Sequence, residues 1–272
     1  MTASYTLRKA FDFYRTAITR YQINSPFVAD FIKEVLKNNR HYYAYGEVDK
    51  LTDRLERDSR VIEHHDLGAG SKYKFNKKTV KSFLQSSSST AYKGKILFHL
   101  ARKYHPNHIL ELGTNLGVGT CYLSLGNKSS TIDSLEGCPN LSKIAQENFH
   151  FLKLNNIKIT IGNFKNTLDE VLESIPQLDL AFLDGDHSYA GTMEYFQKIK
   201  PIIYEKSIVI LDDIYWSEGM TKAWNEIKAD PSVRLSIDLF SIGILFFDTS
   251  VQMDELKLIP YRYKPWKMGF FH

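Results

Sequence analysis

Residues 109–120 read ILELGTNLGVGT, an apolar run that passes directly into a glycine-rich turn and then into a helical pattern. Glycines at such a turn let the backbone change direction tightly and approach a ligand without a Cβ in the way. The stretch therefore predicts a strand, a turn and the start of a helix, which is the repeating unit of a parallel α/β sheet.

Similar apolar runs recur along the rest of the chain and alternate with helical stretches. They occupy residues 131–136, 157–161, 178–184, 207–213, 233–240 and 241–248. Strand followed by helix, repeated, implies parallel pairing with right-handed crossovers. The last two runs are separated by almost nothing, so they must form an antiparallel hairpin. We therefore predict an α/β fold with a Rossmann-like, doubly wound sheet of seven strands that ends in an antiparallel hairpin.

The first 90 residues have a different texture. Residues 5–38 carry apolar side chains at helical spacing, and Ser25 followed by Pro26 is typical of a helix start. Residues 66–90 are rich in glycine, lysine and serine, which predicts an exposed loop. We expect a mostly helical extension over 1–90, whose loop serves as a lid on the substrate side, and one main domain over 91–272.

Composition excludes several classes of protein. The chain has 272 residues, of which 43% are hydrophobic and 24% charged, so it is neither disordered nor fibrous. A formal net charge of +4 is too mild to indicate a nucleic-acid or membrane partner. Cys121 and Cys138 are too few for a disulfide framework. Charges interrupt the N-terminus, and no stretch approaches a membrane span, so we expect a soluble, cytoplasmic protein.

The glycine-rich turn and the acid that follows the next run indicate a nucleoside ligand. Glu136 ends the second run, where a carboxylate can accept hydrogen bonds from both hydroxyls of a ribose. An NAD fingerprint needs the spacing G-x-G-x-x-G, whereas reading from Gly117 puts Tyr122 at the third glycine. A turn that binds nothing is the structural alternative. Together, the two features favour an adenosine-containing ligand other than NAD.

Acidic residues end the fourth and fifth runs. Asp184, Asp186 and His187 follow one strand, and Asp212 and Asp213 end the other. If these strands are neighbours, their carboxylates converge, and their repulsion would raise the pKa of each unless a cation neutralises them. Oxygen ligands suit Mg²⁺ or Ca²⁺. The alternative is that these aspartates cap the helices that follow.

From about residue 91 to 250 the chain resembles the class I S-adenosylmethionine-dependent methyltransferases, and most closely the metal-dependent O-methyltransferases of small molecules. The resemblance implies that the turn after residue 112 wraps the methionine part of the cofactor, that Glu136 binds its ribose, and that three aspartates bind the metal. It assigns the cofactor site to Glu111, Gly113, Thr114, Gly117, Gly119, Glu136, Asn163 and Asp184, and the metal site to Asp184, Asp212 and Asp213.

The sequence departs from the family's pattern in two places. Lys206-Ser207 stands where the family has two glycines before the fifth strand. His187 occupies the position of the catalytic lysine in catechol O-methyltransferases, and Asp186 that of the catalytic aspartate in sugar O-methyltransferases. The catalytic base is therefore Asp186 or His187, with a slight preference for Asp186 from the LDGD match.

Aromatic residues close to these strand ends are candidates for the acceptor pocket. Tyr189, Tyr215 and Trp216 could wall it, whereas Trp224 lies in a helical pattern typical of the core. The segment DLGAGS at 66–71 imitates the first methyltransferase motif, but lysines rather than an apolar helix follow it. We interpret it as a loop.

The resemblance implies O-methylation of a small hydroxylated acceptor, assisted by a divalent cation. Two alternatives stay open: a non-catalytic S-adenosylmethionine-binding protein, and a nucleic-acid methyltransferase. The second is disfavoured because the five lysines between 72 and 81 are typical of a solvated face. The sequence does not name the acceptor, and it leaves a homo-oligomer open.

Overall fold

The computed structural model describes residues 3–65, 75–87 and 90–265 of the chain. Its contacts divide the chain into two compact units. Unit 1 joins residues 1–37 to residues 181–272, and unit 2 is the continuous segment 38–180. The division at residue 90 that the sequence suggested stays a prediction, because the compact units are cut at other points.

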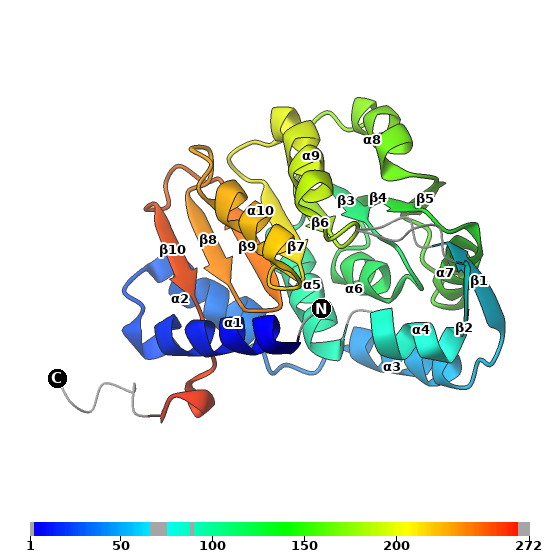
Figure 1. Cartoon of the computed structure of the whole chain (residues 1–272), viewed down its shortest axis with the longest axis horizontal. Coiled ribbons are helices and arrows are strands. Elements are labelled where there is room, and N and C mark those ends of the chain that lie inside the picture. Colours follow the sequence, from blue (N-terminus) through cyan, green and yellow to red (C-terminus); the bar gives the residue numbers. More distant parts are fainter. Residues whose placement is uncertain (1–2, 66–74, 88–89, 266–272) are drawn as a thin grey trace. The chain divides into compact units, whose positions relative to one another are not determined.

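The described part of unit 2 contains six helices, a small hairpin and one half of the large sheet (Figure 1). In chain order its elements are α3 (Tyr43–Glu56), β1 (Val61–His65), β2 (Phe75–Thr79), α4 (Val80–Ser87), α5 (Ala91–Tyr104), β3 (His108–Leu112), α6 (Val118–Gly126), β4 (Thr131–Glu136), α7 (Pro139–Phe151), β5 (Ile157–Ile161) and α8 (Phe164–Glu173).

Unit 1 contains the N-terminal helices and the second half of the sheet. Its elements are α1 (Ala3–Thr16), the 3₁₀ turn η1 (Arg20–Gln22), α2 (Pro26–Phe31), the π-helical η2 (Ile32–Leu36), β6 (Leu180–Leu183, which begins at the boundary), α9 (Tyr189–Ile199), η3 (Lys200–Ile202), β7 (Ile208–Asp212), α10 (Glu218–Lys228), β8 (Leu235–Asp238), β9 (Ile242–Phe246), β10 (Asp254–Lys257) and η4 (Tyr261–Tyr263).

The large sheet has eight strands in the order β10-β8-β9-β7-β6-β3-β4-β5. Strands β3, β4 and β5 are parallel, whereas β9 pairs antiparallel with both β7 and β8. This confirms the doubly wound sheet and its antiparallel hairpin. The sheet has one strand more than expected, because β10 adds in parallel to β8. The short, exposed DELK of β10 lacks the apolar run that marks a buried strand.

Helices of unit 2 pack as their apolar spacing predicts. The apolar face of α7 is buried: Leu141, Ile144, Ala145 and Phe149 are at most 5% exposed. Helix α5 packs along α6, and α3 packs against both α4 and α6 (Figure 1). The loops between strands and helices therefore rest on closely packed elements, which holds residues at the strand ends in place.

The N-terminal residues of unit 1 attach to its sheet edge. Ile18 bridges Leu258 in parallel, just beyond β10, and the rings of Phe27 and Phe31 pack edge-on against Phe246. Ser25 caps α2 by accepting a hydrogen bond from the Val28 N–H, with Pro26 in the first turn, as predicted. The helical prediction for residues 5–38 is therefore confirmed.

The prediction of a loop over residues 66–90 is wrong for residues 75–87. β2 pairs antiparallel with β1, from Val61 opposite Thr79 to His65 opposite Phe75, and α4 follows directly. Pairing overrides the low strand propensity of the lysine-rich β2. The missed signal for α4 is Val80 with Phe83, which are 0% and 3% exposed. The methyltransferase-like segment 66–71 lies outside the described residues.

The altered turn before β7 needs no glycine pair. Ser207 closes it twice, since its N–H donates to the Tyr204 carbonyl and its Oγ accepts from the Tyr204 N–H. As the sequence indicated, Trp224 is a core residue and is only 1% exposed. No helix in residues 3–65, 75–87 and 90–265 is long and apolar enough to cross a membrane.

A glycine in β9 yields the first prediction. A Cβ on Gly243 would lie 2.5 Å from the ring of buried Trp224, so Gly243→Ala should lower the free energy of unfolding by about 1–3 kcal/mol. Gly46, on α3, has nothing within 4 Å of its Cβ position. Gly46→Ala should therefore raise the free energy by about 0.5–1 kcal/mol. Urea titrations of the two variants measure both, and a Gly243→Ala protein as stable as the native one contradicts the packing described.

Candidate functional site

In unit 2 the loop after β3 is held against the end of β4. Gly113 adopts a φ of 102°, and its N–H and that of Thr114 both donate to the Leu135 carbonyl, at 2.9 and 3.2 Å. The Gly117 N–H donates back to the Thr114 carbonyl at 2.8 Å. The loop is therefore shaped by main-chain bonds, and its residues with positive φ are Gly113, Asn115 and Gly117.

The Glu136 carboxylate accepts a hydrogen bond from the middle of the same loop. Its Oε2 accepts from the Asn115 N–H and its Oε1 from the Cys138 N–H, both at 2.8 Å. The side chain is 8% exposed, and burial raises its pKa, which the main-chain N–H donors partly offset. Each carboxylate oxygen has a second lone pair, so the group can still accept hydrogen bonds from a ligand.

Glu111 lies beneath the loop and is 1% exposed. Its Oε2 accepts from the hydroxyls of Thr120 and Ser134, each at 2.5 Å, and Ser134 also shares a hydrogen bond with Thr114. Burial raises the pKa of Glu111 to about 7, against the lowering effect of the two hydroxyl donors. The carboxyl group thus ties β3, the loop, α6 and β4 together from below.

The other residues assigned to the cofactor site begin helices. Gly117 has a φ of 75° and precedes α6, and a Cβ there would lie 2.5 Å from the Phe149 ring. Gly119 lies in the first turn of α6. Asn163 caps α8 by accepting from the Lys165 N–H at 3.0 Å, and the preceding Gly162 donates its N–H to the Glu136 carbonyl. The loops after β3, β4 and β5 therefore meet at Glu136.

Sequence reasoning missed the hairpin of β1 and β2 as a neighbour of this region. The Glu63 carbonyl on β1 accepts from Asn140 Nδ2 at 2.8 Å and from Cys138 Sγ at 3.8 Å. Just before β1, Arg60 forms an ion pair with Glu147 on α7 at 2.9 Å. The hairpin is thus fastened to α7 within a few residues of Glu136, a position that only long-range contacts reveal.

In unit 1 the residues after β6 form a small polar cluster. His187 Nε2 lies 3.7 Å from Asp184 Oδ1, and both side chains are about four-fifths buried, with 23% and 18% exposed. The imidazole also faces the Trp216 ring, with 6.1 Å between ring centroids. The carboxylate and the imidazole therefore face each other within ion-pair distance.

Asp186 has a different role from its neighbour. Its backbone is left-handed, with a φ of 48°, and its Oδ2 accepts from the Tyr195 hydroxyl on α9 at 3.3 Å. A Cβ added to Gly191 would collide with the same carboxylate, so the group is seated in the first turn of α9. The Asp186 carboxylate raises the pKa of Tyr195, although burial contributes more.

Asp212 and Asp213 end β7 but do not join Asp184 in a cation site. Asp212 is 4% exposed, and Asp213 is left-handed with a φ of 50° and donates its N–H to the Ser241 carbonyl. Over residues 3–65, 75–87 and 90–265, no three His, Cys, Asp or Glu side chains lie close enough together to hold a metal ion. Their oxygen chemistry suits Mg²⁺, but their arrangement does not fit one.

The three aromatic candidates differ in exposure. Tyr215 is a packed residue: it is 8% exposed, stacks on Phe240 and donates its hydroxyl to Asp238 at 2.5 Å. Tyr189 donates to Glu226 on α10 at 2.7 Å. Trp216 is 43% exposed and contacts His187, so of the three it is best placed to face a small molecule.

Glu111 yields a prediction about stability and pH. Because its pKa rises from 4.5 to about 7 on folding, the folded chain keeps a proton that the unfolded chain has lost. The carboxyl group's contribution to stability is then fully present below pH 4.5, is lost as the pH rises through about 7, and is flat above that. As the pH rises from 4.5 to about 7, the unfolding free energy of Glu111→Gln should therefore increase by about 3 kcal/mol relative to that of the native protein.

Urea titrations at a series of pH values measure the difference between the two proteins. Glu173→Gln, which changes an exposed carboxylate at the end of α8, is the matched control and should show no such trend. A Glu111→Gln difference that is the same at pH 4.5 and pH 8 would show that Glu111 does not keep its proton on folding.

Comparison with known proteins shows which proteins the chain resembles. A family model described as a methyltransferase domain matches residues 110–214. An uncharacterized protein of Acanthamoeba polyphaga mimivirus is 28% identical over 151 residues, which are 50% of this chain and 66% of that protein. The chain thus spans just under two thirds of the length of this curated relative.

Solved O-methyltransferase structures share the fold. The O-methyltransferase from Bacillus cereus in complex with SAH has a TM-score of 0.55 at 18% identity, covering 81% of this chain and 97% of that one. The O-methyltransferase TomG from Streptomyces achromogenes, in complex with SAM, has a TM-score of 0.56 at 13% identity, covering 79% and 96%. Residues 110–214 therefore match a methyltransferase domain model, and the chain shares the fold of these O-methyltransferases.

Proposed function

We propose that this protein is an S-adenosylmethionine-dependent O-methyltransferase that acts on a small hydroxylated acceptor. The observation that carries the proposal is the loop from Gly113 to Gly117, which is bound to the buried carboxylate of Glu136 at the ends of β3 and β4. The family match over residues 110–214 and the O-methyltransferase fold support it.

The residues of unit 2 suit the cofactor. Glu136 keeps acceptor capacity on both oxygens for two ribose hydroxyls. The first N–H groups of α6 follow Gly117 and, as at any helix start, suit the carboxylate of the methionine part. When bound, S-adenosylmethionine supplies an electrophilic methyl group on a sulfonium sulfur.

Cofactor binding tests the first half of the proposal. Calorimetric titration with S-adenosylmethionine should show binding, and Glu136→Gln should weaken it by roughly 10-fold or more, because one acceptor and the charge are lost. Glu173→Gln on α8 is the control of matched chemistry and should bind as the native protein does. A native protein that does not bind S-adenosylmethionine would overturn the proposal.

We assign the catalytic base to His187. The acceptor hydroxyl oxygen bonds to the methyl carbon as the carbon–sulfur bond breaks, and the hydroxyl proton goes to the imidazole. Asp184 Oδ1 lies 3.7 Å from His187 Nε2 and faces the imidazole that takes the proton. The preference for Asp186 from the LDGD match is not retained, because that carboxylate accepts from Tyr195 and sits in the first turn of α9.

The two candidate bases separate in a methyl-transfer assay against a panel of catechols, phenols and sugars. His187→Ala should lower kcat by about 100-fold or more with S-adenosylmethionine binding unchanged, since a general base contributes at least that much. Asp186→Asn should stay within a few-fold of native, because Asn tolerates the left-handed backbone. The reverse ranking would assign the base to Asp186. Binding without transfer to any acceptor would favour the non-catalytic alternative.

Magnesium assistance stays a sequence-based prediction, and no step above passes through a metal. Turnover that is unchanged in EDTA would overturn that prediction. Turnover that EDTA abolishes and Mg²⁺ restores would support the sequence-based mechanism instead.

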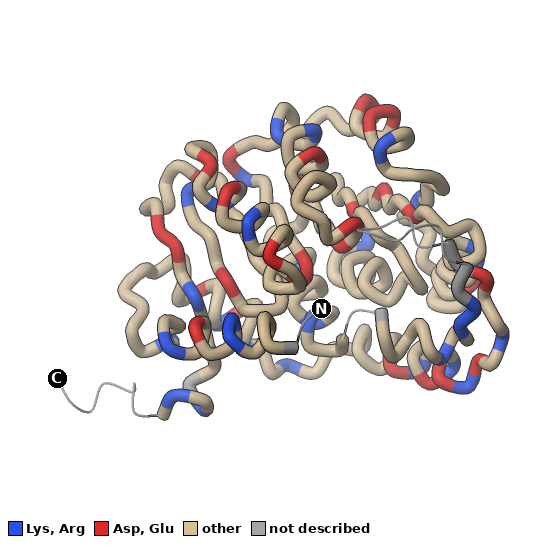
Figure 2. Tube along the Cα trace, in the orientation of Figure 1, with Lys and Arg blue, Asp and Glu red and all other residues tan. Residues whose placement is uncertain are grey.

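A small acceptor is favoured over a nucleic acid. Figure 2 shows acidic and basic residues interspersed along the described parts of each unit. Of the lysines between 72 and 81, Lys77 is paired with Glu63 at 2.8 Å and Lys78 lies over the Phe83 ring. The charge of Lys77 is thus offset by a carboxylate, which weakens the attraction of this segment for a phosphate backbone. Both cysteines are free and buried, which agrees with the proposed cytoplasmic location.

A further inference from the structure

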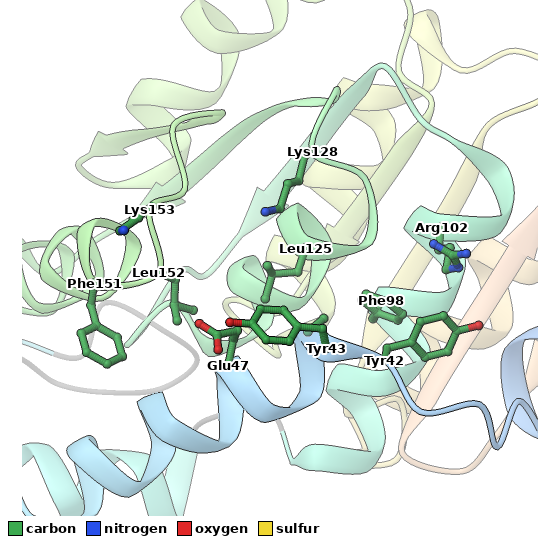
Figure 3. Close-up of a pocket in the computed structure, with 11 residues that line it drawn as sticks. Tyr42, Tyr43, Glu47, Phe98, Arg102, Leu125, Lys128, Phe151, Leu152 and Lys153 are labelled. Carbon is green, nitrogen blue, oxygen red and sulfur yellow. The ribbon is translucent and has the colours of Figure 1, made fainter.

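A hollow of about 460 Å³ lies in unit 2, away from the cofactor loops (Figure 3). It is bounded by α3, the end of α5, the end of α6 and the segment after α7. Lys128 comes just before β4 and Lys153 before β5, so the hollow lies at the amino ends of these strands. The Gly113–Gly117 loop and Glu136 follow the carboxyl ends, at the opposite edge of the sheet. The volume is within the range of small-molecule sites.

The floor of the hollow is apolar and its walls are aromatic. Phe98 and Leu152, which line it, are 2% and 8% exposed, and Phe98 packs against the ring of Tyr42. The rings of Tyr42, Tyr43 and Phe151 stand around this floor (Figure 3). Flat apolar faces suit a planar ring, which can stack on them.

The rim of the hollow is positively charged. Arg102, Lys128 and Lys153 line it with a single carboxylate, Glu47, which makes a formal sum of +3 − 1 = +2. Glu47 is already paired with Lys50 at 2.7 Å, and hydrogen bonds from Lys50 and Tyr43 lower its pKa and keep it ionised. In the described part of the chain no carboxylate lies within 4 Å of Lys128, Lys153 or Arg102. Figure 3 shows these three cations around the hollow.

We propose that this hollow is a second binding site, which takes a small organic anion that joins a planar ring to a phosphate or carboxylate group. The ring packs among the aromatic side chains that line the hollow, and the anionic group meets Lys128, Lys153 and Arg102. S-adenosylmethionine is a poor occupant, because its sulfonium carries a positive charge and the rim repels it. The site is therefore separate from the proposed cofactor site in place and in charge.

Calorimetric titration with 1-naphthyl phosphate tests the proposal, with 2-naphthoate, 2-naphthol and inorganic phosphate as comparison probes. Naphthyl phosphate or naphthoate should bind at least 10-fold more tightly than naphthol or inorganic phosphate, because only these two offer both ring and charge. The tighter of the two identifies the anionic group. Absence of binding by both, or equal binding of neutral naphthol, would overturn the proposal.

Charge reversal locates the site. Lys128→Glu and Lys153→Glu should each weaken binding of the anionic probe at least 10-fold, whereas Lys143→Glu, on an exposed face of α7, should leave it unchanged. All three lysines are exposed, so the variants should fold, and an unchanged urea midpoint checks this. Equal binding by all three variants would place the anion elsewhere. The result does not depend on whether S-adenosylmethionine binds.

Discussion

The buried carboxyl group of Glu111 is the interaction on which the arrangement of unit 2 depends. It is taken out of water at the end of β3 and bonded to Thr120 on α6 and Ser134 on β4. The Ser134 hydroxyl also shares a hydrogen bond with the Thr114 hydroxyl in the loop above. A polar group that is buried and fully bonded holds its partners in one geometry, because breaking any bond leaves it unsatisfied. The loop that faces a ligand is therefore supported from below by a residue that does not itself reach the surface.

Unit 1 shows how backbone conformation separates residues that are adjacent in sequence. Asp186 and Asp213 both adopt the left-handed region, which costs free energy for residues other than glycine. In Asp186 this turn directs the carboxylate into the start of α9, next to Gly191. His187, one residue later, lies with Asp184 and Trp216 instead. Two groups that seem interchangeable in the sequence thus have different neighbours.

Much of the fold could be predicted, because its signals are local. The apolar runs that became β3 to β9 mark strands, which are mostly buried except for β5, and the periodicity of α7 marks a buried helical face. The hairpin of β1 and β2 could not be predicted, since polar residues such as Lys77 are held in a strand by pairing with a partner rather than by propensity. Strand β10 was missed for the same reason. Its DELK carries no apolar run, and β8 is what makes it a strand.

The sequence by itself determined the class of fold, the glycine turn after β3 and the acid after β4, because spacing along one chain sets which residues end a strand. Only the tertiary structure showed that Glu111 lies beneath the loop and that the Asp186 carboxylate packs against the start of α9. Within the described residues, it does not gather three ligands of the predicted metal site into one cluster. It alone brought Lys128, Lys153 and Arg102 around one hollow. The physical reason is that burial and side-chain direction depend on contacts between distant segments, which spacing along the chain does not contain.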